Sequence, residues 1–406
     1  MNILMLTPVY PGPKVDKSYT KVVHYFTKEW SSIGENVQVV AVPSFFPSVY
    51  YRIPVWLRSK LTKWFNIVVP SQRNSKISIY EIDNVSVLSI PLFKLLPHYS
   101  YSNKILKKAN KIIIDYLNKK NFCPDIIVAH WIQPSAYFIS ALKKVYNCPT
   151  VLVQHGYSFN HNCEYLEDVD IWGYRNEKTR DAISQNLPLA EIGFRCYSGV
   201  PKDFLKPMIK REWKSTNRYV FIGTFIPLKF PDITIDALET YYNPDNSFHL
   251  SMVGDGPLLN KLKTSTQKGK YRNNICFYGR IDRSKIIEIL DQSDVFIMIS
   301  ENEAYGLSYI EAMARGCIVI ASEGEGMAGI IENGVNGYLC EAGNKDELMK
   351  IIEIINLLSP EQRSDISKNA RSTAEKLSDT NVAKEYLKHL SSLVNDNNIK
   401  NCPNYN

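Results

Sequence analysis

The chain has 406 residues, of which 45% are apolar and 22% are charged, and its formal net charge at pH 7 is +7. This composition is typical of a globular protein with two or three domains, and it excludes a wholly disordered, collagenous or multi-span membrane chain. The charge is uneven, because residues 1–205 carry a net charge of +9 and the remainder carries −2. The first residues, MNILMLTPVY, lack a basic segment and a long apolar core, so we expect a first strand here and not a signal peptide. We therefore expect a cytoplasmic protein whose eight cysteines are reduced.

Short β-rich runs alternate with longer amphipathic stretches along both halves of the chain. In the first half the sequence predicts strands at 2–6, 36–42, 84–90, 125–129 and 149–154, and helices at 18–33, 102–119 and 134–146. In the second half it predicts strands at 218–223, 248–254, 274–279, 294–300 and 317–322, and helices at 230–241, 257–267, 284–292, 307–315, 344–357 and within 360–395. Apolar strands that alternate with helices are typical of parallel sheets built from right-handed βαβ units. We therefore predict an α/β protein of two doubly wound, Rossmann-like domains that face each other across a cleft.

The predicted domain boundary lies in a stretch at 200–217 that is rich in prolines and charges and has no clear period. We predict that residues 1–205 form the N-terminal domain and that residues 206–378 form the C-terminal domain. Residues 379–406 are predicted to form a C-terminal helix that packs back on the N-terminal domain, followed by a frayed tail.

The segment ENEAYGLSYIEAMARG, residues 301–316, directly follows a predicted strand. Glu303 falls in the loop between strand and helix, Gly306 permits a tight turn, and a helix that begins near Leu307 carries Glu311 one turn further on. The free N–H groups of a helix start attract anions, and ionised carboxylates accept hydrogen bonds from sugar hydroxyls. The segment therefore indicates a diphosphate site flanked by two carboxylates. The alternative is a capped surface helix with two solvated glutamates.

The run from Glu303 to Gly316 resembles the two-glutamate motif of the retaining GT-B glycosyltransferases of family four, also described as glycosyl transferases group 1. The resemblance covers most of the chain, since MVGDGP (252–257), IENGVNGYL (331–339) and SGVPKDFLKP (198–207) are also similar to motifs of that family. Transferases of capsule, teichuronic-acid and O-antigen synthesis look most similar.

This resemblance implies the GT-B fold and a retaining hexosyltransferase-type enzyme of class EC 2.4. Such an enzyme moves a sugar from a nucleotide-sugar donor to a saccharide or polyprenyl-diphosphate-linked acceptor in bacterial surface polysaccharide synthesis. The resemblance also implies that residues 1–205 bind the acceptor, that residues 206–378 bind the donor, and that no metal or other cofactor is needed.

The resemblance assigns roles to particular residues of the C-terminal domain. It implies that Lys229 binds the diphosphate, that Glu311 binds the ribose and that Glu303 acts at the sugar ring. The other donor-binding residues that it implies are Thr224, Gly254, Arg280, Tyr305, Gly306 and Leu307. Thr224 stands where the family usually has an arginine, and a threonine supplies no charge. We expect Arg280 to compensate for it.

Two histidines each end a predicted strand of the N-terminal domain. His130 follows the strand at 125–129, and His155 follows the strand at 149–154. A histidine at a strand end can hydrogen-bond a sugar hydroxyl or a phosphate. The resemblance favours a catalytic role for both, and for His155 more than for His130. The alternative is a pair of half-buried structural histidines.

Residues 45–76 contain six basic residues, several aromatic residues and no acidic residue. We predict that they dock on an anionic membrane surface, so that the protein is peripheral on the inner face of the cell membrane. The alternative is a solvated lid whose aromatic side chains pack on the N-terminal domain. No nucleic-acid motif accompanies this segment, so we expect no nucleic-acid partner.

Two other interpretations of the chain concern its glycines and its departures from the family. GEGMAG, residues 324–329, spells G-x-G-x-x-G, but no acidic residue follows at a strand end about 20 residues later, which argues against a nicotinamide site. We interpret it as a glycine-rich loop near the donor.

Thr224 and Gly329 favour a catalytically silent binding partner of the same fold. A sugar phosphorylase or an epimerase of this fold is a further alternative.

Overall fold

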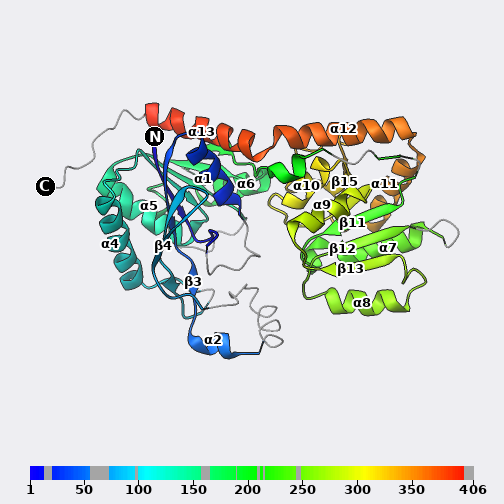
Figure 1. Ribbon diagram of the computed structural model, residues 1–406, viewed down its shortest axis with the longest axis horizontal. Coiled ribbons are helices and arrows are strands. Elements are labelled where there is room, and N and C mark those ends of the chain that lie inside the picture. Colours follow the sequence, from blue (N-terminus) through cyan, green and yellow to red (C-terminus); the bar gives the residue numbers. More distant parts are fainter. Residues whose placement is uncertain are drawn as a thin grey trace. The chain divides into compact units, whose positions relative to one another are not determined.

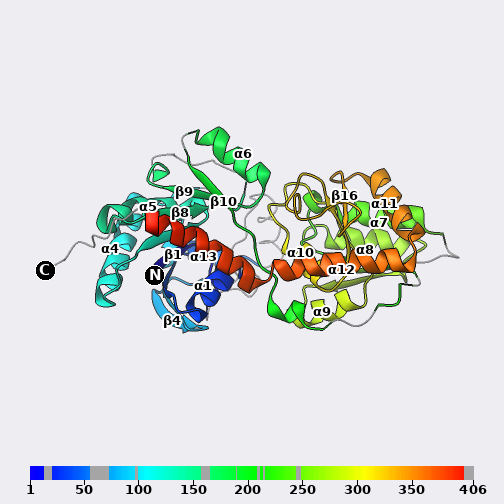
Figure 2. The same cartoon turned by 90° about the horizontal axis from the view of Figure 1, so that it is seen from above.

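The computed structural model of this protein describes residues 1–12, 21–54, 73–96, 99–156, 165–188, 190–207, 211–213, 215–243 and 248–396. The chain divides into two compact units (Figures 1 and 2). The first unit comprises Met1–Gly199 with Asp379–Asn406, and the second comprises Val200–Ser378. The first unit therefore takes residues from both ends of the chain. The observed division lies at 199/200, whereas the predicted boundary is at 205/206.

The first unit is built on an eight-stranded sheet of order β10-β9-β8-β7-β1-β2-β5-β4. Its strands are β1 (Asn2–Thr7), β2 (Asn36–Ala41), β4 (Ser78–Ile82), β5 (Val85–Ser89), β7 (Ile126–His130), β8 (Thr150–Val153), β9 (Ile171–Tyr174) and β10 (Ile192–Arg195). All neighbouring strands are parallel except the edge strand β4, which is antiparallel to β5. The five strands predicted in this half are confirmed. A separate parallel pair joins β3 (Ser44–Phe45) to β6 (Leu92–Phe93).

Helices cover this sheet in two groups. The helices of the unit are α1 (Val22–Ser32), α2 (Ser48–Arg52), α4 (Asn103–Lys119), α5 (Ile132–Tyr146), α6 (Glu177–Asn186) and α13 (Asp379–Asp396). Leu4 and Leu6 point to one face of β1 and share a buried apolar cluster with Ile113 of α4 and Leu142 of α5. Helices α1 and α13 pack against each other, and Trp30 Nε1 donates a hydrogen bond of 2.8 Å to the Ala383 carbonyl. The C-terminal helix is thus part of the first unit.

The second unit is built on a six-stranded, wholly parallel sheet of order β13-β12-β11-β14-β15-β16. Its strands are β11 (Arg218–Ile222), β12 (His249–Val253), β13 (Ile275–Gly279), β14 (Val295–Met298), β15 (Ile318–Ser322) and β16 (Tyr338–Cys340). The five strands predicted in this half are confirmed, and β16 was not predicted. The strand order reverses at β11, because β12 pairs on one side of it and β14 on the other. Ligands of such sheets bind at this reversal, beyond the carboxyl ends of the strands.

The helices of the second unit also follow the predicted order. They are α7 (Pro231–Tyr241), α8 (Leu259–Lys268), α9 (Arg283–Asp291), α10 (Leu307–Ala314), α11 (Lys345–Leu357) and α12 (Pro360–Lys376), with short 3-10 turns at Lys202–Leu205 and Pro227–Lys229. The helical stretch predicted within 360–395 is two helices, because the chain leaves the second unit between α12 and α13. At this break the Val200 N–H donates a hydrogen bond of 2.8 Å to the Leu377 carbonyl.

One expectation about the cysteines is wrong. Five cysteines are free thiols, namely Cys148, Cys196, Cys276, Cys317 and Cys340. Cys123, after α4, is instead in a disulfide. Spacing along the sequence did not indicate this bond, because disulfides depend on the distance between two residues in the fold. In the part of the chain that the structure describes, no helix has both the length and the apolar character needed to cross a bilayer.

Candidate functional site

The main cluster of predicted site residues lies where the strand order of the second unit reverses. Lys229 closes the 3-10 turn that follows β11, and Glu303 lies in the loop that follows β14. The Lys229 Nζ is 3.0 Å from the Glu303 Oε2, and the two side chains are 21% and 16% exposed. The same Nζ lies 3.7 Å from the sulfur of Met298. The structure therefore brings together, as a half-buried ion pair, the two residues expected at the diphosphate and at the sugar ring.

Backbone contacts hold the neighbouring loops in place around this ion pair. The Glu301 N–H donates a hydrogen bond of 2.8 Å to the Leu228 carbonyl, which ties the loop after β14 to the loop after β11. Gly254, after β12, has φ +140°, and a Cβ there would lie 1.9 Å from the Gly223 carbonyl oxygen. Only glycine fits such an approach. The predicted role of Gly254 in donor binding stays a prediction, but its position beside the loop after β11 is set by this contact.

Glu311, the second glutamate of the motif, is buried on α10. Gly306 precedes the helix with φ +77°, and Leu307 is its first residue. The Glu311 carboxylate contacts the guanidinium of Arg283 on α9. The Arg283 side chain is 39% exposed. Burial raises the pKa of Glu311, and the charge and hydrogen bond of Arg283 act against that increase. Arg283 therefore favours the ionised form of Glu311, whereas burial alone would favour the protonated, neutral form.

The glycine-rich loop after β15 supports the loop that carries Glu303. The buried carboxylate of Glu325 accepts a hydrogen bond of 2.9 Å from the backbone N–H of Glu303. A Cβ at Gly326 would lie 2.5 Å from the Cα of Tyr305, so glycine lets the two loops touch. Tyr305 is buried, and its predicted donor contact stays a prediction. Glu325 was not predicted from the sequence, because its position between two glycines is the only feature that distinguishes it there.

Two other predicted donor-binding residues, Thr224 and Arg280, lie at the carboxyl ends of two strands that β12 separates. Thr224 follows β11 and Arg280 follows β13, and both side chains are exposed. Within the described residues, no ion pair includes Arg280. The arginine that contacts a predicted site residue is Arg283. Sequence reasoning missed Arg283, because its contact with Glu311 depends on how α9 packs beside α10.

The four charged side chains of this site form two ion pairs. Lys229 is already balanced by Glu303, and Arg283 by Glu311, so the four side chains are together neutral. A phosphate oxygen that reaches the Lys229 Nζ takes the place of a carboxylate of similar charge. Glu303 is then left to accept hydrogen bonds from neutral donors such as sugar hydroxyls.

A second cluster lies in the first unit and joins the two predicted histidines. His130 is the fully buried last residue of β7, and its Nδ1 is 2.7 Å from the Nε2 of His155, which follows β8. On its other side, the Nε2 of His130 lies 3.4 Å from the hydroxyl of Tyr386 on α13. The indole of Trp131 stacks on the His155 ring with centroids 4.0 Å apart. Tyr386 was missed at the sequence level, because it lies 256 residues from His130 along the chain.

Both histidines are neutral near pH 7. Burial and the positive charge of Arg175 lower the pKa of His130 to about 3 and lower that of His155 well below its usual value. In a neutral pair, one ring N–H donates to the lone pair of the other ring. Tyr386, His130 and His155 thus form a chain of three uncharged groups that can each donate and accept a proton. Among the described residues, no group of three or more His, Cys, Asp or Glu side chains could hold a metal ion.

Comparison with protein families gives one match, and it falls inside the second unit. The family described as "Glycosyl transferases group 1" matches residues 207–373. An uncharacterised glycosyltransferase of Methanocaldococcus jannaschii is 26% identical over 312 residues, 73% of this chain and 82% of that protein. The amylovoran biosynthesis glycosyltransferase AmsK of Erwinia amylovora is 23% identical over 379 residues, 87% of this chain and 90% of that protein.

A third relative matches less of the chain. It is the UDP-Gal:alpha-D-GlcNAc-diphosphoundecaprenol alpha-1,3-galactosyltransferase of Escherichia coli, 28% identical over 170 residues, 40% of this chain and 41% of that protein.

Solved structures show that the fold of the chain is that of GT-B glycosyltransferases. A glycosyltransferase from Rickettsia africae superposes with a TM-score of 0.71 at 18% identity, covering 97% of this chain and 98% of that one. The Anabaena protein HepE in complex with UDP superposes with a TM-score of 0.66 at 17% identity, covering 97% of this chain and all of that one.

Proposed function

Because residues 207–373 match the family described as "Glycosyl transferases group 1", we propose that this chain is a retaining glycosyltransferase that uses a nucleotide-sugar donor. Its acceptor is proposed to be a saccharide, carried on a polyprenyl diphosphate, in the synthesis of a bacterial surface polysaccharide such as a capsule or O-antigen. The observation that carries this proposal is the contact of Lys229 with Glu303 at the strand reversal of the second unit.

The donor is proposed to lie against the second unit. Lys229 binds the diphosphate, Glu303 accepts hydrogen bonds from the sugar ring, and Glu311 accepts them from the ribose. The contact between Arg283 and Glu311 supports the last role, because an ionised carboxylate is the form that accepts from two hydroxyls. The complex of Anabaena HepE with UDP suggests uracil as the base of the donor.

The chemistry is proposed to be a front-face attack in which the leaving phosphate takes the proton of the acceptor hydroxyl. Negative charge then builds on the departing diphosphate, where the fixed ammonium of Lys229 stabilises it. The neutral pair of His130 and His155 is proposed to act on the acceptor side. No metal is part of this proposal, so a chelator such as EDTA is expected to leave the rate unchanged.

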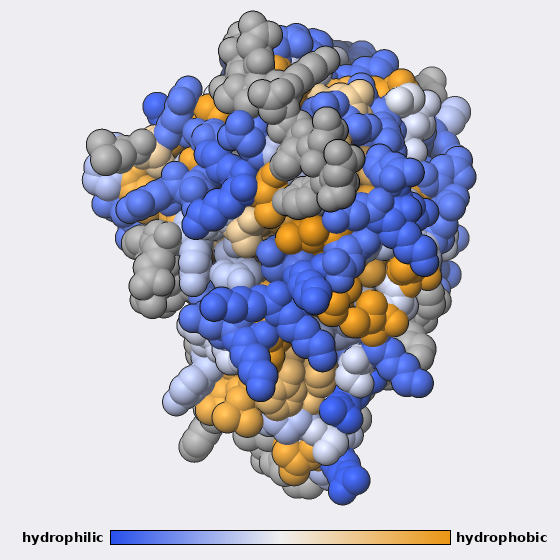
Figure 3. Space-filling model, turned by 90° about the vertical axis from the view of Figure 1, so that its left-hand side faces the viewer, coloured by the Kyte–Doolittle hydropathy of each residue, from blue (hydrophilic) through white to orange (hydrophobic). Residues whose placement is uncertain are grey.

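The proposal for the acceptor and the proposal for membrane docking rest on different observations. The Escherichia coli relative is named for an acceptor on diphosphoundecaprenol, and the Erwinia relative for amylovoran synthesis. In the predicted membrane segment 45–76, residues 55–72 lie outside the described residues. Nearby in the first unit, several large apolar side chains are exposed, namely Val49, Ile77, Ile79, Leu95, Leu96 and Tyr99. In Figure 3, apolar residues gather among hydrophilic ones toward the lower end of the face.

We propose that this apolar group, with the basic residues of segment 45–76, docks the protein on the cytoplasmic surface of an anionic membrane. The test is sedimentation with vesicles of phosphatidylglycerol and phosphatidylcholine. We expect binding to the anionic vesicles that weakens in the double variant Val49→Asp/Leu95→Asp. The variant Leu357→Asp, at an exposed leucine of the second unit, is the matched control. Equal binding of all three proteins contradicts this docking surface.

The donor proposal is tested by the melting temperature of the protein with a panel of nucleoside diphosphates and nucleotide sugars. A ligand at about 100 times its Kd adds about 2.7 kcal/mol of apparent stability. We expect one base to stabilise the wild type, and this effect to be lost in Lys229→Ala and in Glu311→Ala. A panel without any shift contradicts the proposal.

A second candidate function is a catalytically silent binding partner, because the exposed Thr224 supplies no charge where the family usually has an arginine. Donor turnover distinguishes this silent partner from an active transferase. A protein that binds a nucleotide sugar but releases no nucleoside diphosphate, with any saccharide acceptor offered, fits the silent partner.

A further inference from the structure

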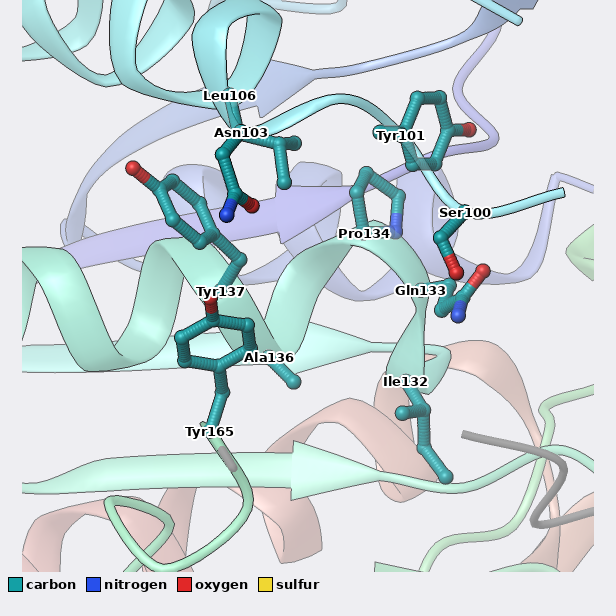
Figure 4. Close-up of a pocket in the computed structure, with 10 residues that line it drawn as sticks. All are labelled: Ser100, Tyr101, Asn103, Leu106, Ile132, Gln133, Pro134, Ala136, Tyr137 and Tyr165. Atoms are coloured by element: carbon teal, nitrogen blue, oxygen red, sulfur yellow. The ribbon is translucent and has the colours of Figure 1, made fainter. Parts of the chain in front are cut away.

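The first unit contains a pocket between the starts of α4 and α5 (Figure 4). Its volume is about 160 Å³, which is below the range of pockets for drug-sized ligands and suits a single small ring. Ser100 and Tyr101 precede α4, Asn103 begins it, and Gln133 and Tyr137 lie in the first turns of α5. Tyr165, from the loop before β9, completes the aromatic lining. The pocket lies wholly within the first unit.

The lining of the pocket combines aromatic rings with side-chain amides. Tyr137 and Tyr165 meet edge to face with ring centroids 5.3 Å apart, and Tyr101 is held by a hydrogen bond of 2.6 Å between its hydroxyl and that of Ser44. Figure 4 places Tyr137 and Asn103 on one side of the pocket and Tyr101 and Ser100 on the other. Within the described residues, no hydrogen bond occupies the side-chain amide of Asn103.

Such a lining matches the chemistry of a sugar ring. A pyranose has apolar C–H faces, which pack on aromatic rings, and a rim of hydroxyls that both donate and accept hydrogen bonds. Amides offer two donors and an acceptor, so they can bond neighbouring hydroxyls. Among the described residues that line the pocket none is charged, which argues against a phosphate or a nucleotide here.

The pocket adjoins the histidine pair along the chain. Ile132, which lines it, directly follows Trp131, and the Trp131 indole stacks on His155. The pocket therefore begins one residue beyond the tryptophan that packs on His155. The His130 side chain itself contacts Tyr386 on α13, whereas residues of α4 and α5 line the pocket.

We propose that this pocket binds one sugar ring of the saccharide acceptor, with Tyr137 packed on its C–H face and the amides of Asn103 and Gln133 bonded to its hydroxyls. This inference rests on the proposed function. It goes beyond it by naming the residues that recognise the acceptor.

The test is saturation-transfer NMR with the methyl glycosides of glucose, galactose, N-acetylglucosamine and N-acetylgalactosamine. We expect at least one of them to bind the wild type, and its affinity to fall about twofold to tenfold in Tyr137→Ala, because one aromatic packing contact is lost. Asn103→Ala, at an exposed position, is a second variant that leaves the core intact. Tyr278→Ala, at an exposed tyrosine of the second unit, is the matched control and should bind as the wild type does.

The melting shift caused by UDP is measured on the same proteins and separates the two proposals. A wild type that responds to UDP but binds none of the glycosides overturns the pocket and leaves the proposed function standing. Glycoside binding that is unchanged in both Tyr137→Ala and Asn103→Ala also overturns the pocket. A wild type that binds a glycoside but responds to no nucleotide contradicts the proposed donor chemistry and not the pocket.

Discussion

The carboxyl edges of the two sheets carry different chemistry. In the second unit this edge carries the ion pair of Lys229 with Glu303 and, on the adjoining helices, that of Arg283 with Glu311. In the first unit it carries the neutral pair of His130 and His155, near the buried Arg175. Two units of the same architecture thus differ at this edge, because one carries two ion pairs and the other a neutral histidine pair.

This difference matches the two substrates of a glycosyl transfer. A nucleotide sugar carries a diphosphate, which is bound by fixed positive charges. Before the diphosphate binds, carboxylates can balance these charges. A saccharide brings hydroxyls, which need neutral groups that donate, accept and pass protons. We propose that charge separates the donor side from the acceptor side, and four experiments test this proposal.

Loss of the ammonium at Lys229 should have the largest effect. In Lys229→Ala we expect kcat to fall by about 100-fold or more, because a preorganised charge no longer stabilises the leaving diphosphate. The measurement is release of nucleoside diphosphate at saturating donor. Lys263→Ala, at an exposed lysine of α8, is the control. Equal rates for the two variants would remove Lys229 from the site.

Loss of Arg283 should destabilise the second unit through Glu311. In Arg283→Ala we expect the free energy of unfolding to fall by about 2 kcal/mol at pH 8, less than for a fully buried pair because Arg283 is partly exposed. Burial raises the pKa of Glu311, so a protonated, neutral carboxyl is favoured once its partner is gone. The deficit should therefore shrink as the pH is lowered toward 5. Urea unfolding at both pH values measures it, and a deficit that grows on acidification contradicts this pairing.

The histidine pair should make the first unit less stable in acid. Because burial lowers the pKa of His130 to about 3, the unfolded chain binds a proton below about pH 6.5 that the folded chain does not. Between pH 7 and 5.5 this effect alone should remove about 1 kcal/mol of stability. His130→Gln should flatten that part of the pH profile, as measured by urea unfolding. An unchanged profile would show that His130 is charged in the folded protein.

A charge added at Thr224 should have the smallest effect and sharpen the comparison. Thr224 is exposed in the loop that also carries Lys229, so Thr224→Arg should tighten UDP binding by about threefold, the scale of one exposed charge pair. Titration calorimetry measures the change. The variant Thr224→Gln, which is uncharged, should bind UDP as the wild type does. Tighter binding by Thr224→Gln would assign the gain to size and not to charge.

Much of the fold could be predicted from the sequence, because buried parallel strands are continuous apolar runs. All ten predicted strands are present, among them CIVIAS, whose residues form β15. The strands that were missed are short or half exposed. β9 and β16 have four and three residues, and β4 alternates between half-buried and exposed positions at the sheet edge.

Local pattern and family motif single out Glu303 and Lys229 in the sequence, and the structure brings these two residues into contact. Arg283, Glu325 and Tyr386 were not singled out, because each acts through a contact that forms only when helices or loops pack together. Such contacts leave no period or spacing in the sequence.

The chain leaves the first unit after Gly199 and returns to it at Asp379. These two residues touch, since a Cβ on Gly199 would lie 2.3 Å from the Asp379 Cα, and Val200 forms a parallel bridge to Ser378. In topological terms, the second unit is a single uninterrupted insertion whose two ends are adjacent. We therefore expect residues 200–378, the unit proposed to bind the donor, to fold when they are expressed alone. A short linker that joins residue 199 directly to residue 379 would give the first unit as one continuous chain that keeps its C-terminal helix.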